Sequence, residues 1–138
     1  MAASGTTRRV PLIMVVEDQD DGRDLLREAF EEQGFAVVEA SNGKAALERL
    51  QSLPRPDLVI LDLEMPVMSG QELVDEMTAD EKLSDLPVLV FTGNNRTEMP
   101  LQGPIVRWLS KPCSLVRLLE TVSECLALRS LTPPAKLA

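Results

Sequence analysis

Short apolar runs that alternate with stretches of helical periodicity constrain the fold of this chain more than any other feature. Strand-like runs cover residues 12–16, 35–39, 57–62, 87–92 and 105–110. Several of them are continuously apolar, which is typical of strands that helices bury on both faces. Strands that alternate with helices predict a parallel sheet with right-handed crossovers, so the sequence indicates an α/β fold.

The segments between these runs carry helix signals. Residues 20–33 have apolar side chains at helical spacing, and Gly34 suits the C-terminus of that helix. Three further helices are expected to begin at small polar residues, namely Asn42, Ser69 and Ser114. By contrast, residues 93–104 contain two glycines, two prolines and no apolar stripe. We therefore expect the fourth helix of the alternating pattern to be short or missing.

The length of 138 residues and the hydrophobic fraction of 44% suit one domain with a core of its own. We expect that domain to cover residues 10–130, with tails at residues 1–9 and 131–138. The chain carries 22 acidic and 14 basic residues, and the net charge of -8 disfavours direct binding to nucleic acid. No stretch approaches the length of a membrane-spanning helix, so we expect no membrane partner.

The chain contains no histidine, which limits its chemistry. His-ligated zinc, hydrolysis by Ser-His or Cys-His pairs and a phosphohistidine role are excluded. The two cysteines, Cys113 and Cys125, form no CxxC motif, and two thiols suit a reducing cytoplasm. We therefore expect a cytoplasmic protein whose chemistry uses carboxylates, lysine, hydroxyls, cysteine or a bound cation.

Polar side chains follow most of the expected strands. Glu17 and Asp18 follow the first strand, Asp62 ends the third, Thr92 ends the fourth and Lys111 follows the fifth. Ligands of open parallel α/β sheets bind beyond the carboxyl ends of the strands, so these side chains should meet at one rim. The repulsion energy of each contacting pair of carboxylates there is about 1 kcal/mol in water and about 4 kcal/mol at an effective dielectric constant near 20.

One lysine does not offset this repulsion, whereas a divalent cation would. Ligands that are all oxygen atoms favour a hard ion, Mg²⁺ over zinc. Mg²⁺ often bridges a carboxylate to a phosphoryl oxygen, and one carboxylate would then be free to receive a phosphoryl group as an acyl phosphate. A lysine and a hydroxyl would hold the remaining phosphoryl oxygens.

Four segments, in this order, resemble the motifs of one known family. They read Val-Val-Glu-Asp-Gln-Asp-Asp at 15–21, Leu-Asp-Leu-Glu-Met-Pro-Val-Met-Ser-Gly at 61–70, Val-Phe-Thr-Gly at 90–93 and Leu-Ser-Lys-Pro at 109–112. These segments resemble the acidic-pair, phosphoacceptor, switch-threonine and lysine motifs of the response-regulator receiver domain. The resemblance implies a stand-alone, single-domain receiver. Its fold would be a flavodoxin-like, doubly wound, five-stranded parallel sheet of order 2-1-3-4-5 with helices on both faces.

The resemblance also implies a metal site. In the family's pattern Asp18 would bind Mg²⁺ directly and Glu17 would bind it through water. Asp62 and the backbone carbonyl of Glu64 would supply further ligands.

A phosphorylation switch is implied by the same resemblance. Asp62 would accept the phosphoryl group, Lys111 would pair first with Asp62 and then with the phosphoryl oxygens, and Thr92 would move to hydrogen-bond them. Trp108, three residues before Lys111, stands at the position of the family's conformation-reporting aromatic residue. The bond between Lys111 and Pro112 is expected to be cis, an isomer that X-Pro bonds adopt at little cost.

The resemblance implies partners rather than substrates. A histidine kinase or a histidine-containing phosphotransfer protein would donate the phosphoryl group, because this chain has no histidine. The signal would leave through contact with an unknown downstream protein. The chain would not be an enzyme, except that it would catalyse its own phosphorylation and dephosphorylation.

Several alternatives stay open. Residues 93–104 replace a helix that belongs to the family's common output surface, so a phosphorylation-independent interaction module with the same fold is one alternative. A second is an enzyme such as a haloacid-dehalogenase-like phosphatase, which also uses an aspartate nucleophile with Mg²⁺. Those enzymes require a second aspartate two residues after the nucleophile, where this chain has Glu64. The chain could also be a receiver cut from a longer protein.

Overall fold

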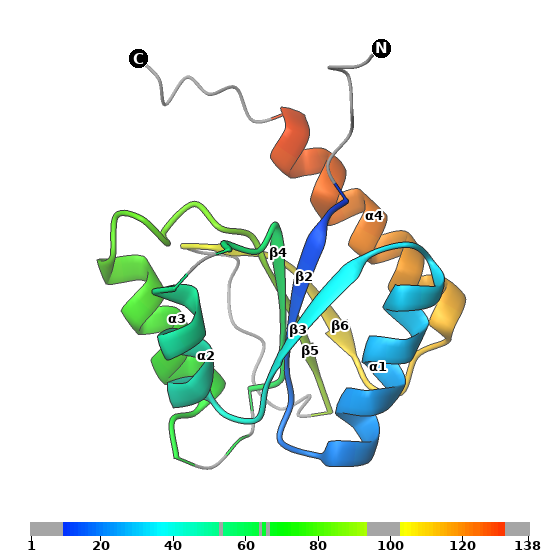
Figure 1. Ribbon diagram of the computed structural model, residues 1–138, viewed down its shortest axis with the longest axis horizontal. Coiled ribbons are helices and arrows are strands. Elements are labelled where there is room, and N and C mark those ends of the chain that lie inside the picture. The colour runs from blue at the N-terminus through cyan, green and yellow to red at the C-terminus, as the bar shows by residue number, and fades with distance from the viewer. Residues whose placement is uncertain (1–9, 53, 64, 66, 94–102, 132–138) are drawn as a thin grey trace.

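The computed structural model describes residues 10–52, 54–63, 65, 67–93 and 103–131 (Figure 1). Its strands are β2 (Leu12–Val16), β3 (Ala36–Ala40), β4 (Leu58–Leu61), β5 (Val88–Thr92) and β6 (Ile105–Ser110). Its helices are α1 (Asp20–Glu32), α2 (Gly43–Leu50), α3 (Gly70–Ala79) and α4 (Leu115–Leu131). All paired strands are parallel, in the order β3-β2-β4-β5-β6. Counted along the chain, this is the predicted order 2-1-3-4-5, so the flavodoxin-like fold is confirmed.

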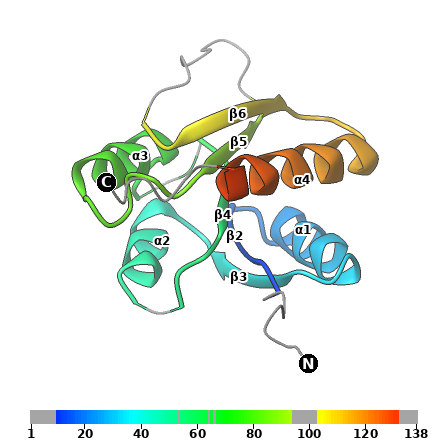
Figure 2. The same cartoon turned by 90° about the horizontal axis from the view of Figure 1, so that it is seen from above.

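The helices cover the two faces of the sheet in pairs, α2 with α3 and α1 with α4 (Figure 2). Successive strand residues serve opposite faces because side chains alternate along a strand. Met14 and Val16 of β2 pack with α2 and α3, whereas Ile13 and Val15 pack with α1 and α4. Burial on both faces explains why the central strands read as continuous apolar runs.

The strand order places a topological switch point at β2. The chain leaves β2 for β3 on one side and later returns to β4 on the other side of β2. The residues that follow β2 and β4 therefore come out side by side at the carboxyl edge of the sheet. In α/β sheets, this is the position where ligands bind.

Side-chain caps fix the starts of three helices as predicted. The Asn42 side chain accepts a hydrogen bond from the Ala45 N–H at 2.8 Å, and the Ser114 hydroxyl accepts one from the Arg117 N–H at 3.1 Å. Ser69 forms a capping box with Glu72 in which each side chain accepts from the other residue's backbone N–H. Such caps satisfy N–H groups that have no partner inside the helix. Their satisfaction explains why small polar residues mark these helix starts.

Helical spacing predicts that Leu25 and Leu115 lie on the buried stripes of their helices, but both side chains are exposed. Leu25 of α1 is 67% exposed, and Leu115 at the start of α4 is 50% exposed. The buried stripe of α1 consists of Leu26, Ala29 and Phe30, because only that side of the helix faces the sheet.

The predicted short or missing fourth helix concerns residues 93–104, of which residues 94–102 lie outside the described residues. Within the residues described, the chain between β5 and β6 contributes no helix. The expected tails also lie outside, except for Leu131, which belongs to α4. No helix in the described part of the chain is both long enough and apolar enough to cross a membrane.

Val67 adopts a strained backbone conformation. Its φ is 68°, and its side chain is 73% exposed. A β-branched residue rarely adopts this left-handed region, whereas asparagine tolerates it. The substitution Val67→Asn is therefore expected to raise the free energy of unfolding by about 1 kcal/mol. Urea denaturation measures the change.

Val116 supplies the control for this prediction. It is 66% exposed on α4, where the backbone is helical. The change Val116→Asn relieves no strain and should leave stability unchanged or slightly lower. An equal effect of the two substitutions would show that Val67 stores no backbone strain.

Candidate functional site

Three carboxylates converge where β2 and β4 end. Glu17 and Asp18 follow β2, and Asp62 follows β4, its neighbour in the sheet. The ladder extends into the site, because the Asp62 N–H donates to the Val16 carbonyl at 3.2 Å and the Glu17 N–H donates to the Ala40 carbonyl at 3.1 Å. One oxygen from each carboxylate lies within 4.8 Å of the others. Residues 45 positions apart therefore face one another because parallel strands end at one edge.

Thr92 and Lys111 complete the group from the next two strands. The Thr92 hydroxyl donates to Asp62 Oδ1 at 2.9 Å. Lys111 Nζ donates to Glu17 Oε1 at 2.6 Å and to Asp62 Oδ2 at 3.4 Å. The Lys111 backbone N–H also donates to the Thr92 carbonyl at 2.9 Å. Both oxygens of Asp62 thus have a donor, one from β5 and one from the residue after β6.

Burial strengthens these interactions. Glu17 is 3% exposed and Thr92 is 1% exposed, while Asp62 is also buried and Asp18 is half-buried. A buried carboxylate needs an opposite charge or hydrogen-bond donors to offset its lost hydration. Lys111 provides the charge, and it also lies 5.3 Å from the centre of the Phe91 ring, within the range of a cation–π contact.

The charge state of Lys111 reflects two opposing effects. Burial disfavours the charged ammonium, but the hydrogen bond that it donates to Glu17 and the charges of Asp62 and Glu17 favour it. The second effect prevails, so the pKa of Lys111 lies above its ordinary value. Lys111 is therefore a cation at neutral pH.

The donor set fits a hard divalent cation. Three carboxylates and one ammonium leave a formal charge of -2 at the site, by the arithmetic of three negative groups and one positive group. All candidate ligands are oxygen atoms, which Mg²⁺ prefers. Glu17, Asp18 and Asp62 are the residues that could hold the ion. The backbone carbonyl of Glu64, predicted as a further ligand, lies outside the described residues.

Trp108 lies on β6 and packs against the core on the side of α2 and α3. Its indole Nε1 is buried and has no hydrogen-bond partner among the described residues. Its predicted role as a conformational reporter stays a prediction. The peptide bond between Lys111 and Pro112 is cis, as expected.

Two residues near the site escaped the sequence analysis. Arg23 of α1 donates from Nη1 to the Glu17 carbonyl at 2.8 Å. Gly70, the first residue of α3, lies so close to Asp62 that a Cβ there would come within 2.7 Å of the Asp62 carbonyl oxygen. In the sequence, Arg23 is only a basic residue soon after the acidic pair, which is a weak signal. The close contact between Gly70 and Asp62 has no sequence signal other than the glycine itself.

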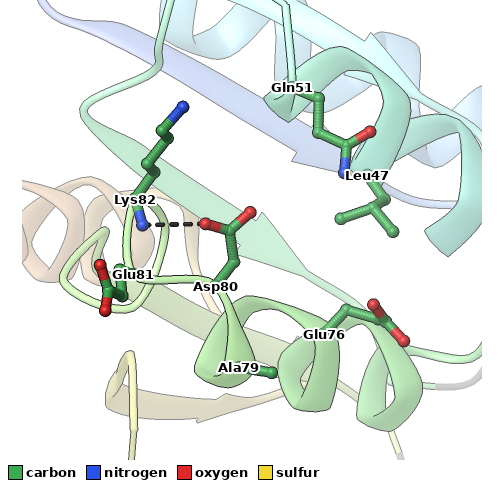
Figure 3. A pocket seen from close by; sticks show the side chains of 7 residues that line it. All are labelled: Leu47, Gln51, Glu76, Ala79, Asp80, Glu81 and Lys82. Atoms are coloured by element: carbon green, nitrogen blue, oxygen red, sulfur yellow. Dashed lines mark hydrogen bonds between the residues drawn. The ribbon is translucent and has the colours of Figure 1, made fainter.

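A separate hollow of about 400 Å³ lies between the C-terminal ends of α2 and α3 (Figure 3). Its lining is formed by Leu47, Gln51, Glu76, Ala79, Asp80, Glu81 and Lys82. The Lys82 N–H donates to Asp80 Oδ1 at 2.9 Å (Figure 3). None of these lining residues belongs to the carboxylate group, so the hollow is not part of the site at the strand ends.

Most of the chain is similar in sequence to known proteins. Residues 13–123 match the response regulator receiver domain family. The polar-differentiation response regulator DivK of Brucella anthropi is 32% identical over 117 residues, which cover 83% of this chain and 94% of DivK.

Solved structures give the same likeness. The response regulator TrrA from Thermotoga maritima, solved in complex with Mg²⁺-BeF, is 31% identical with a TM-score of 0.74. The alignment covers 84% of this chain and 99% of that one. A signal receiver domain of a histidine kinase from Syntrophus aciditrophicus is 28% identical, with a TM-score of 0.77 and coverage of 90% and 94%.

Proposed function

This chain belongs to the response regulator receiver domain family, and we propose that it is a phosphoacceptor switch in two-component signalling. Members of this family are signalling modules rather than classical enzymes. In the proposal, Asp62 receives a phosphoryl group from a histidine kinase or a histidine-containing phosphotransfer protein. The observation that carries the proposal is the pairing of Asp62 with donors from Thr92 and Lys111 beside two further carboxylates.

In the proposed reaction a carboxylate oxygen of Asp62 attacks the phosphorus atom of the donor. The bond from phosphorus to the donor's imidazole nitrogen breaks, the nitrogen keeps the electron pair, and an acyl phosphate forms on Asp62. Glu17, Asp18 and Asp62 would hold Mg²⁺, which when bound neutralises charge on the phosphoryl oxygens. Lys111 adds a positive charge on the side of Glu17 and Asp62.

The switch follows from what Thr92 and Lys111 contact. Both donate to Asp62 in the structure, and a phosphoryl group would offer them new acceptor oxygens. The two residues are joined through their backbones at the ends of β5 and β6. A movement of Thr92 or Lys111 would therefore also move the backbone at the end of β5 and strand β6, which carries Trp108. We propose that a downstream protein reads this change by direct contact.

We also propose that the chain works in the cytoplasm. Cys113 and Cys125 are both free thiols, as a reducing compartment would keep them.

The proposal is tested by phosphorylation with a small-molecule donor. The chain is incubated with Mg²⁺ and acetyl phosphate, and its intact mass is recorded. We expect an adduct of roughly 80 Da on the wild type and none on Asp62→Ala. Asp21→Ala is the matched control, because Asp21 is an exposed acid in the first turn of α1, and this variant should keep the adduct.

Other outcomes would overturn the proposal. If the wild type forms no adduct, the alternative of a phosphorylation-independent interaction module would be favoured instead. An adduct that persists in Asp62→Ala would place the phosphoryl group elsewhere. Rapid release of phosphate from phosphate esters, with catalytic turnover, would instead indicate a phosphatase.

A further inference from the structure

Arg23 links the acidic pair to two other parts of the fold. From α1, its Nη1 donates to the Glu17 carbonyl at 2.8 Å, and its Nε donates to Glu39 Oε1 at 3.2 Å. Its Nη2 donates to Asp20 Oδ1 at 2.7 Å. The Arg23 side chain is only 15% exposed, and its contacts with Glu17 and Glu39 are partly buried, whereas the contact with Asp20 is exposed to water.

We infer that Arg23 is a positioning residue for the cation site, which it serves by holding the backbone of Glu17 and Asp18. Arg23 itself would not touch the cation. The inference rests on the proposed function, because it concerns the same three carboxylates.

The backbone of Glu17 is held at both of its polar groups. Its N–H pairs with the Ala40 carbonyl, and its carbonyl accepts from Arg23. The side chain of Glu17 then accepts from Lys111 at Oε1 and from the Gln19 N–H at Oε2. Of these partners, Arg23 is the one that fixes the peptide between Glu17 and Asp18, and this peptide sets the direction of the Asp18 side chain.

Glu39 fixes the orientation of the guanidinium. It lies near the end of β3, and its second oxygen, Oε2, accepts from Arg27 Nη1 at 3.3 Å. A planar guanidinium has several donors in a rigid fork, so one side chain can span a carbonyl and a carboxylate. Arg23 thereby ties together the ends of β2 and β3 and the start of α1.

The direction in which Mg²⁺ affinity changes when Arg23 is lost distinguishes a positioning role from a purely electrostatic one. A positive charge near a cation site repels the cation, so on electrostatic grounds alone the loss of Arg23 should tighten Mg²⁺ binding. A positioning role predicts the opposite, because carboxylates that no longer converge bind the ion less well. Loss of a residue that orients metal ligands typically weakens metal binding by roughly tenfold to a hundredfold.

The test compares Arg23→Met with Arg27→Met by calorimetric titration of the whole chain with MgCl₂. Arg27 is the matched control, since it is one turn further along α1 and pairs with Glu39 and with acids of its own helix. We expect Arg23→Met to raise the Mg²⁺ dissociation constant roughly tenfold. Arg27→Met should leave the Mg²⁺ dissociation constant unchanged or lower it. Arg23→Lys should behave like Arg23→Met, because a single ammonium keeps the charge but lacks the fork.

A metal-free measurement keeps the inference separate from the proposed function. Hydrogen exchange of the Gln19 N–H, which is bonded to Glu17 Oε2, should become faster in Arg23→Met and stay at the wild-type rate in Arg27→Met. If wild type binds no Mg²⁺, the proposed metal site fails, and the exchange result alone decides the role of Arg23. Unchanged exchange in Arg23→Met, or Mg²⁺ binding as tight as in wild type, would overturn the inference.

Discussion

Replacing Lys111 with methionine is expected to lower the free energy of unfolding at neutral pH by about 2 kcal/mol. The ammonium is the cation between Glu17 and Asp62, at 2.6 and 3.4 Å. Methionine has a similar length but leaves these buried carboxylates to repel one another. Loss of one partner from a fully buried pair costs about 3–5 kcal/mol, and Lys111 is 31% exposed, so we expect a smaller loss.

Mg²⁺ should compensate for this loss. Lys111 and the cation compete for the same carboxylates, and a unit charge at 4 Å is worth about 4 kcal/mol at an effective dielectric constant near 20. Tenfold tighter binding needs only about 1.4 kcal/mol. Lys111→Met should therefore bind Mg²⁺ more tightly than wild type, by roughly tenfold or more. Its unfolding midpoint should also rise more steeply with MgCl₂.

The pH dependence gives an independent check. The pKa of Lys111 is raised in the folded state above its ordinary value of 10.5. The stabilisation from its charge is thus fully present below pH 10.5 and is lost as the pH rises through the folded-state pKa. Urea denaturation in the absence of Mg²⁺ should show the gap between wild type and Lys111→Met narrowing in that alkaline range.

Lys44 provides the control, because it is exposed on α2. The change Lys44→Met should alter stability by less than about 0.5 kcal/mol at any of these pH values. If Lys111→Met is as stable as Lys44→Met near neutral pH, the ion pairs of Lys111 contribute nothing to the fold.

The sequence was sufficient to predict the positions of the main site residues, for a physical reason. Glu17, Asp18, Asp62, Thr92 and Lys111 each stand at a strand end, and parallel strands present those ends at one edge. To predict that these five side chains lie close together, it was therefore enough to identify the strands. Their exact contacts, such as Lys111 lying closer to Glu17 than to Asp62, depend on side-chain packing that no periodicity encodes.

Other features depend on contacts between distant segments. Asp57 was expected to open a strand, but it lies just before β4, where its carboxylate accepts the Leu12 N–H at 2.8 Å. The exposure of Leu25 depends on how α1 sits on the sheet, and helical spacing alone cannot show it. The reach of Arg23 to the Glu17 carbonyl likewise requires the folded start of α1. Local pattern thus predicts elements, whereas the supports of the site arise from tertiary packing.

Gly70 has no side chain, so α3 can pack directly against the backbone of Asp62. A Cβ on Gly70 would lie 2.7 Å from the Asp62 carbonyl oxygen and 2.7 Å from Leu63 Cα, both of them backbone atoms that cannot rotate away. Gly70→Ala is therefore expected to lower the free energy of unfolding by about 3 kcal/mol, at the upper end of typical overpacking costs. It should also slow adduct formation by acetyl phosphate, because the backbone that carries Asp62 must move relative to Thr92.

Gly22 allows the same chemical change without a clash. It lies in α1, and the nearest atom to an added Cβ is Glu17 Cγ at 3.8 Å, an ordinary contact. Alanine is favoured over glycine within a helix, so Gly22→Ala should raise stability by about 0.5–1 kcal/mol and leave adduct formation unchanged. Urea denaturation of the two variants should thus give changes of opposite sign. Equal stability would mean that α3 can move away from Asp62 at no cost, and the close packing of α3 would then not hold Asp62 in place.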